Sequence, residues 1–324
     1  MSPLGFGSAP IGNLYAPVDE DDAQAAIHAA LARGVCYFDT APFYGHGLSE
    51  QRLGRALAGT PRAAFAVSTK VGRRIARDAS VSQAMNDGFA VRGSRAVFDY
   101  SRDGVRRSFE ESLRRLGLDY VDILLLHDIG RLTHGERHGA VLKQALDEAL
   151  PAMAQLRDSG VVGAIGIGVN EQVACLEVLA QFELDCIMLA GRYTLFEQKD
   201  STEIMERATA QRVAILVAAP YNSGLLAAAE GPGTTYNYAL ADEATLERAR
   251  AIYAQCAEEG IEVGAVALQF PLGHPAVAAV VPGLRSTEEL ISAVSRMATP
   301  IPPGLWERLR RAQLLAERTA VPGA

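Results

Sequence analysis

Short apolar runs alternate with longer amphipathic stretches along the whole chain, and this alternation restricts the fold more than any other feature. Continuous apolar strands that alternate with helices predict a parallel sheet covered by helices. Eight strands are expected, at Leu4–Gly7, Val35–Asp39, Ala64–Lys70, Tyr120–His127, Val161–Asn170, Leu184–Tyr193, Val213–Pro220 and Val277–Gly283. Eight such units predict an α/β fold, a closed (β/α)8 TIM barrel that takes residues 1–324 as one domain. A doubly wound open sheet is the alternative.

Two stretches are too long for a minimal strand–helix unit. They run from Val71 to Ser101 and from Asp128 to Val141, and each follows a predicted strand. In a barrel both become long loops on the C-terminal face, where insertions shape the substrate pocket. The chain then closes with a predicted C-terminal helix that carries the only tryptophan, Trp306, as a packing residue.

Composition narrows the choice of partners. The 324 residues carry a net charge of -7, which disfavours nucleic acid and anionic membranes. No apolar run approaches the ~18 residues of a membrane span, and the N-terminus shows no secretory signal, so a cytoplasmic location is expected. The four cysteines are scattered without a CxxC or His/Cys cluster, which predicts reduced thiols and no metal site. Nothing in the sequence predicts an oligomeric state.

Polar residues end four successive predicted strands. Asp39, Lys70, His127 and Asn170 come last in strands two to five, and Tyr44 lies in the glycine-rich loop after Asp39. The C-terminal ends of barrel strands meet at one mouth, where such barrels perform chemistry, so these side chains should converge. Each also has a plainer interpretation: Asp39 as a turn cap, Lys70 as a solvated lysine and His127 as a hydrogen-bonded core histidine.

The chemistry that such a set supports is proton transfer. A free tyrosine has a pKa of ~10, too high for a base near neutrality. An ammonium at ~4 Å attracts a phenolate by roughly 4 kcal/mol at an effective dielectric constant of about 20. Lys70 is therefore expected to lower the pKa of Tyr44, with Asp39 fixing Lys70 and His127 orienting the substrate oxygen.

The contexts "FDTAPFYGHG", "VSTKVG" and "DILLLHD" make these four residues resemble the catalytic tetrad of the aldo-keto reductases. We use "tetrad" below for Asp39, Tyr44, Lys70 and His127. The resemblance covers essentially the whole chain and implies a (β/α)8 barrel that binds a nicotinamide cofactor. The segments "LAGRYTLFEQ" and "APYNSGLL" are similar to the sugar-oxidising branch, whose members act on D-threo-aldoses such as L-fucose, on L-galactose or on pyridoxal.

This branch implies oxidation of an aldose such as L-fucose at C1 to its lactone. Tyr44 would be the general acid/base, taking the hydroxyl proton while hydride leaves for the nicotinamide. The same roles run backwards in reduction. The expected partner is thus a small sugar or aldehyde, and Phe43, Asp128, Arg192 and Asn222 are the candidate substrate contacts.

The resemblance also implies cofactor contacts. Asn170 matches an asparagine that holds the carboxamide, Ala190 stands where many members have a glutamine, and Tyr193 or Tyr221 is a candidate for stacking on the nicotinamide. The pyrophosphate would be wrapped by Ala219, Pro220, Tyr221, Ser223, Gly224 and Leu225. The adenosine end falls on Gly283, Arg285, Ser286 and Glu289. A carboxylate at Glu289 repels a 2′-phosphate, so NAD is preferred, while Arg285 and Ser286 keep NADP possible.

Two functions from other classes compete with this prediction. A redox-sensing regulatory subunit of the same fold would keep the cofactor and turn over poorly. A Schiff-base aldolase or isomerase would use Lys70 as a nucleophile. The intact tetrad disfavours the first, and a charged lysine beside Asp39 disfavours the second.

Overall fold

Eight parallel strands form the wall of a barrel in the computed structural model, which describes residues 1–82 and 85–323. In order around the sheet they are β1 (Gly5–Gly7), β2 (Tyr37–Asp39), β3 (Ala66–Val71), β6 (Val121–His127), β7 (Val162–Val169), β8 (Cys186–Ala190), β9 (Ala214–Ala218) and β12 (Val277–Val281). Parallel bridges from Leu4 to Val280 and from Gly7 to Gly283 join the first strand to the last. The sheet therefore comes close to full closure, and the open-sheet alternative is wrong.

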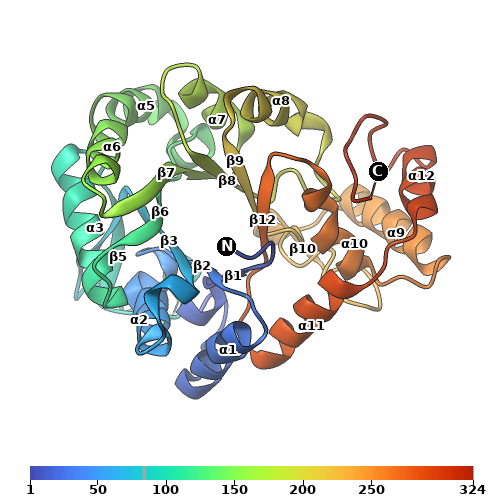
Figure 1. Cartoon of the computed structure of the whole chain (residues 1–324), viewed down its shortest axis with the longest axis horizontal. Coiled ribbons are helices and arrows are strands. Elements are labelled where there is room, and N and C mark those ends of the chain that lie inside the picture. Colours follow the sequence, from blue (N-terminus) through green and yellow to red (C-terminus); the bar gives the residue numbers. More distant parts are fainter. Residues whose placement is uncertain (83–84, 324) are drawn as a thin grey trace.

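Helices form an outer ring around the strands, as Figure 1 shows. The ring contains α1 (Glu20–Ala32), α2 (Leu48–Leu57), α3 (Arg102–Leu116), α6 (Leu150–Asp158), α7 (Gln172–Leu179), α8 (Thr202–Gln211), α9 (Glu243–Ala257), α10 (Val263–Gln269) and α11 (Thr287–Ala298). The last helix, α12 (Pro303–Arg311), buries Trp306 against Phe270. The predicted barrel, its C-terminal helix and the packing role of Trp306 are confirmed.

The two predicted long loops contain secondary structure of their own. The first holds an antiparallel ribbon of β4 (Arg73–Arg77) and β5 (Ser94–Phe98), with residues 83 and 84 outside the described part. The second contains α4 (Arg131–His134) and the start of α5 (His138–Gln144). A further hairpin of β10 (Thr235–Tyr236) and β11 (Ala239–Leu240) follows β9 and was not predicted. All three insertions follow the C-terminal ends of barrel strands.

The barrel interior is filled by side chains. Tyr37, Leu125, Met188 and Leu216 form a buried cluster there. Their apolar bulk fixes the strands from inside, so residues at the strand ends are held on a rigid support. Among the helices of the described residues, none combines the length and hydropathy of a membrane span.

Candidate active site

A buried ion pair lies at the ends of two neighbouring strands. Lys70 donates hydrogen bonds to both carboxylate oxygens of Asp39 at 2.7 Å each and to the carbonyl of Thr40 at 3.0 Å. The two side chains are 2% and 4% exposed. Asp39 also accepts from the hydroxyl of Ser68 at 2.7 Å, and Ser68 is hydrogen-bonded to Tyr37 in the barrel interior. All three N–H donors of Lys70 are used, so this residue is neither a solvated lysine nor a free amine.

Tyr44 follows β2 in a tightly packed turn. The next residue, Gly45, has φ +61°, and a Cβ there would lie 2.2 Å from the carbonyl oxygen of Gly12. Only glycine fits this position, which explains one of the glycines in the loop after Asp39. The turn places the Tyr44 ring beside Lys70, whose Nζ lies 4.7 Å from the ring centre.

The pKa of Tyr44 moves in the opposite direction to the one predicted. Burial raises this pKa well above its ordinary value, and the carboxylate of Asp39 raises it further. The expectation that Lys70 lowers the pKa of Tyr44 towards 7 is wrong for the protein residues alone. Asp39 offsets the charge of Lys70, and removal from water penalises the phenolate. Tyr44 is therefore a protonated phenol near pH 7.

His127 ends β6 and presents a neutral imidazole to the same place. Its ring packs edge-on against the ring of Tyr44, with centroids 6.1 Å apart and an interplanar angle of 87°. Burial lowers the pKa of His127 to about 3, although the nearby Asp128 carboxylate acts to raise it. A neutral imidazole can exchange a hydrogen bond with a substrate oxygen without adding charge.

The four predicted tetrad residues are thus brought together from three strand ends. Lys70 contacts Asp39 and the Tyr44 ring, and Tyr44 contacts His127. The arrangement can hold a substrate oxygen between a phenol and an imidazole, with a fixed positive charge behind the phenol.

The four predicted substrate residues have different surroundings. Phe43 lies beside His127, with ring centroids 6.1 Å apart, and Asp128 Oδ2 lies 3.5 Å from His127 Nε2. Arg192 donates instead to Asn237 in the β10–β11 hairpin. The Asn222 side chain is buried, accepting from Thr194 and donating to the carbonyl of Gly191, so its amide links two loops within the protein.

A cavity of ≈ 610 Å³, here called the mouth cavity, opens beside the tetrad. Asp39, Tyr44 and Asn222 line it, with the predicted cofactor residues Ala190, Ala219, Pro220, Tyr221, Ser223, Gly224, Gly283, Arg285 and Glu289. Most of the cofactor contacts that the resemblance implies therefore share one cavity with Asp39 and Tyr44 of the tetrad.

The turn after β9 offers unused backbone donors to this cavity. Ala219, Asn222, Ser223 and Gly224 all have positive φ. In the described part of the chain, the N–H groups of Ser223 and Gly224 bond to no protein acceptor. Two adjacent N–H groups that face a cavity are suited to an anion such as a pyrophosphate. Leu225 differs, because it is buried and its N–H already donates to the carbonyl of Asn222 at 3.2 Å.

The two tyrosines predicted as candidates for stacking on the nicotinamide differ in their surroundings. Tyr221 lines the cavity, and the guanidinium of Arg296, another lining residue, lies 5.4 Å from the centre of its ring. Tyr193 packs away from the cavity against Phe270, with ring centroids 5.6 Å apart. Tyr221 is thus the better placed of the two predicted stacking candidates. Asn170 donates to the hydroxyl of Tyr238 at 3.3 Å, and Tyr238 lines the cavity.

An exposed ion pair marks the far end of the mouth cavity. Arg285 and Glu289 lie 3.1 Å apart and are 45% and 42% exposed. Glu289 also accepts from the backbone N–H of Arg285 at 2.9 Å, and Ser286 caps α11 through a bond from the Glu289 N–H. This end can hold hydroxyl groups, and it presents a carboxylate.

Sequence reasoning missed several residues that line the mouth cavity. Ala293 and Arg296 follow Glu289 at helical spacing (i, i+4, i+7), so their common face was available as a signal. Tyr15 and Tyr238 lie in irregular segments, where no periodicity points to them. Across the described ranges, no cluster of three or more His, Cys, Asp or Glu side chains is arranged to hold a metal ion.

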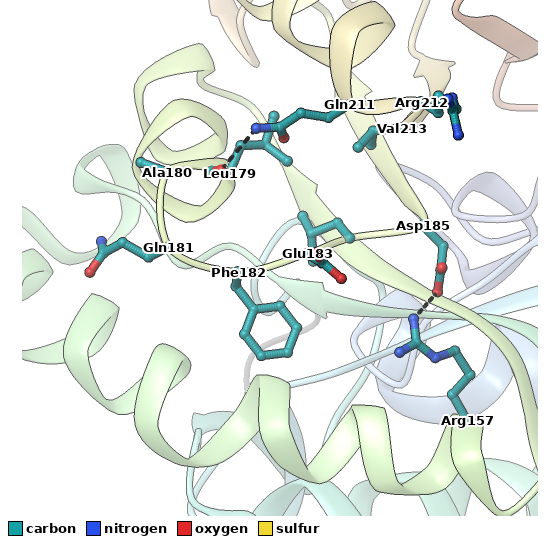
Figure 2. Close-up of a pocket in the computed structure, with 11 residues that line it drawn as sticks. Arg157, Leu179, Ala180, Gln181, Phe182, Glu183, Asp185, Gln211, Arg212 and Val213 are labelled. Atoms are coloured by element: carbon teal, nitrogen blue, oxygen red, sulfur yellow. Dashed lines mark hydrogen bonds and ion pairs between the residues drawn. The ribbon is translucent and has the colours of Figure 1, made fainter.

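A second cavity of ≈ 710 Å³ lies at the other end of the barrel, before the N-terminal ends of β8 and β9 (Figure 2). This floor cavity is lined by an ion pair of Arg157 with Asp185 at 2.7 Å, and by Gln211, whose amide donates to the carbonyl of Leu179. Asp185 also accepts the backbone N–H of Ile165. No tetrad residue lines this cavity, and the Arg157–Asp185 pair and Gln211 hold loops together.

Comparison with known proteins places these features in a wider group. The family model described as "Aldo/keto reductase family" matches residues 3–313. A D-threo-aldose 1-dehydrogenase of Pseudomonas sp is 40% identical over 317 residues, covering 96% of this chain and 94% of its own. A pyridoxal 4-dehydrogenase of Microbacterium luteolum is 37% identical over 329 residues, covering 98% and 95%. A solved aldo-keto reductase from Bacillus halodurans, in its holo form, superposes with a TM-score of 0.73 at 27% identity, covering 99% and 93%.

Proposed function

The chain belongs to the aldo/keto reductase family and is an oxidoreductase, and from this premise we propose that it oxidises an aldose such as L-fucose at C1 to the lactone. The convergence of the tetrad beside the mouth cavity carries the proposal. The choice of an aldose is supported by the 40% identity to a D-threo-aldose 1-dehydrogenase over nearly the whole of both chains.

The tetrad divides the work of proton transfer. Tyr44 exchanges a proton with the oxygen on the reacting carbon, and neutral His127 orients that oxygen by a hydrogen bond. Lys70 keeps a positive charge beside the phenol, and Asp39 fixes Lys70 through two bonds of 2.7 Å. Because the pKa of Tyr44 is raised, the phenol is ready to donate, and oxidation requires that it first lose its proton. Oxidation should therefore speed up as the pH rises into the alkaline range.

Aldo-keto reductases use NAD or NADP, and the mouth cavity fits such a group. When bound, the nicotinamide accepts hydride, and its positive charge in the oxidised form favours the phenolate of Tyr44. The free N–H groups of Ser223 and Gly224 would hold the pyrophosphate, and Tyr221 would pack against the nicotinamide ring. Asn170 would take the carboxamide.

We propose NAD as the preferred cofactor. Glu289 lines the far end of the cavity and is paired with Arg285, so its carboxylate offsets the charge that the arginine would present to a 2′-phosphate. A carboxylate accepts hydrogen bonds from the ribose hydroxyls of NAD and repels the phosphate of NADP.

Pyridoxal oxidation is the second candidate, because the pyridoxal 4-dehydrogenase relative is 37% identical over 98% of this chain. The same proton chemistry would act on the hemiacetal form of pyridoxal. A Schiff-base enzyme is disfavoured, since all three N–H donors of Lys70 are used. We further propose that the chain acts as one domain in the cytoplasm, on a small molecule, without nucleic acid or membrane as partner.

The test is the appearance of reduced nicotinamide absorbance with NAD+ or NADP+ and a panel of L-fucose, L-galactose, D-arabinose and pyridoxal. Turnover of L-fucose or D-arabinose with NAD+, lost in Tyr44→Phe, is the expected result. Turnover of pyridoxal alone would make pyridoxal the substrate in place of an aldose and would leave the proposed proton transfer unchanged. Cofactor binding without turnover on the whole panel would favour a redox sensor.

A further inference from the structure

A second ion pair lies at the mouth of the barrel, next to the tetrad but outside it. Arg73 donates to Asp128 Oδ2 at 2.6 Å, and the side chains are 16% and 14% exposed. The guanidinium also stacks on the ring of Phe43, 3.4 Å from its centre. Phe43 directly precedes Tyr44, so the pair is attached to the same turn that carries the proposed acid/base.

The β4–β5 ribbon brings Arg73 to this position. Gly72 joins β3 to β4 with φ +96°, and a Cβ there would lie 2.5 Å from the ring of Tyr100. Only glycine allows the backbone to pass this close to the Tyr100 ring as the chain leaves the barrel strand. Arg73 is the first residue of β4 and stands opposite Phe98 of β5 in the ladder, with its guanidinium 5.0 Å from the centre of that ring. The arginine is thus held between two aromatic rings.

Asp128 is fixed equally firmly. Its backbone is left-handed, with φ +51°, a conformation that aspartate tolerates better than most residues. Its N–H donates to the carbonyl of Gly168, and its carbonyl accepts from Tyr100 at 2.9 Å and from His134 at 2.8 Å. These bonds hold the carboxylate beside His127, with Asp128 Oδ2 3.5 Å from His127 Nε2.

The pair keeps hydrogen-bonding capacity that the protein does not use. Asp128 Oδ1 and Arg73 Nη2 have no partner among the described residues. They offer one acceptor and one donor, the two kinds of hydrogen-bonding group that a hydroxyl can use. Two oxygens on neighbouring carbons of a sugar ring are separated by about the length of a hydrogen bond. Since His127 Nε2 lies 3.5 Å from Asp128 Oδ2, the two side chains are close enough for neighbouring oxygens of one sugar ring to reach one residue each.

We propose that Arg73 and Asp128 bind the hydroxyl on the carbon next to the one that is oxidised, and so determine substrate specificity. The inference rests on the proposed function and narrows it to cyclic sugars with a hydroxyl at C2. Pyridoxal lacks a hydroxyl on the carbon bonded to its reacting carbon, so the pair selects against it. Arg73 and Asp128 take no part in proton transfer to the reacting oxygen.

The experiment compares kcat/KM for L-fucose and 2-deoxy-L-fucose in the wild type, Arg73→Met and Asp128→Asn. Asparagine suits the left-handed backbone of position 128, so the second variant tests the charge without straining the loop. Hydrogen bonds to charged groups predict that the wild type favours the hydroxylated sugar by about 10²-fold. Both variants should bring this ratio towards 1, mainly by lowering activity on L-fucose.

Arg74→Met is the matched control. Arg74 is the next residue of β4 and pairs with Asp99 at 3.2 Å, so its loss removes the same charge from the same ribbon and should leave the ratio unchanged. A variant that only loosens the site lowers both activities together, so the ratio separates recognition from structural damage. Equal efficiency on the two sugars in the wild type would overturn the inference while the aldose assignment stands. No turnover of either sugar would overturn both.

Discussion

The mouth and the floor of the barrel each carry a cavity, and the two are of similar volume, ≈ 610 Å³ at the mouth and ≈ 710 Å³ at the floor. Each also carries an ion pair of 2.7 Å, Lys70 with Asp39 at the mouth and Arg157 with Asp185 at the floor. The mouth pair is almost completely buried, whereas the floor pair is 33% and 38% exposed. Volume does not distinguish the two ends, whereas charges held out of water beside unused hydrogen-bond donors single out the mouth as the candidate site.

The largest expected effect is at Tyr44. Tyr44→Phe removes the group that exchanges the proton and keeps the ring, so kcat should fall by about 10²- to 10⁴-fold. Steady-state assays of sugar oxidation measure the loss of kcat. Titration with cofactor should show that the affinity for the cofactor is unchanged. The floor counterpart, Gln211→Ala, should change kcat less than about twofold, since Gln211 only donates to the carbonyl of Leu179. An equal loss in both variants would contradict the assignment of the mouth.

The ion pairs should differ in their contribution to stability. Lys70→Met leaves the Asp39 carboxylate buried without a counter-charge, which should lower the free energy of unfolding by about 3–5 kcal/mol. Arg157→Met breaks a partly exposed pair and should cost about 0–1 kcal/mol. Denaturant titration of the two variants makes the comparison. The double variant Lys70→Met/Asp39→Asn should recover part of the loss, and a fully additive result would show that the pair is uncoupled.

The pH dependence of stability should also reflect the mouth. Because burial lowers the pKa of His127 to about 3, the unfolded state binds a proton from about pH 6.5 downwards while the folded state does not. Stability should fall as the pH drops from about 6.5 through 3, with His127 contributing up to about 1.4 kcal/mol per pH unit. The charges of Asp128, Lys70 and Arg73 act on the ring, and Tyr44 packs against it. His127→Gln should show a shallower slope in denaturant titrations across this range, and identical slopes would rule out this contribution.

The smallest expected effect lies at the far end of the mouth cavity. Glu289→Gln removes a carboxylate that repels a 2′-phosphate, so the ratio of kcat/KM for NADP+ to that for NAD+ should rise about tenfold. Glu288→Gln is the control, because Glu288 carries the same charge at the neighbouring position and does not line the cavity. If both variants shift the ratio equally, net charge rather than a specific contact decides the cofactor.

The mouth was largely predictable from the sequence because strands fix it. Asp39, Lys70 and His127 end strands whose apolar runs are unambiguous, so their convergence follows from the barrel itself. The rest depended on loops, where side-chain direction follows from packing and not from periodicity. Asn222 and Leu225 matched a motif, yet their hydrogen bonds are made within the protein. Tyr238 and Arg73 are placed at the mouth by the β10–β11 hairpin and the β4–β5 ribbon, and the sequence pattern predicted neither. The raised pKa of Tyr44 required knowledge of its burial, which no spacing supplies.

The β4–β5 ribbon has a consequence for how such an enzyme can change. It leaves the barrel at Gly72, carries Arg73 at its base, and pairs with no barrel strand among the described residues. The proposed proton chemistry and the proposed substrate recognition thus draw on different parts of the fold. The first uses the strand ends and the turn after β2, and the second uses the ribbon together with Asp128 after β6. Gene libraries that randomise the ribbon alone are therefore expected to change which sugars are accepted while Asp39, Tyr44, Lys70 and His127 stay in place.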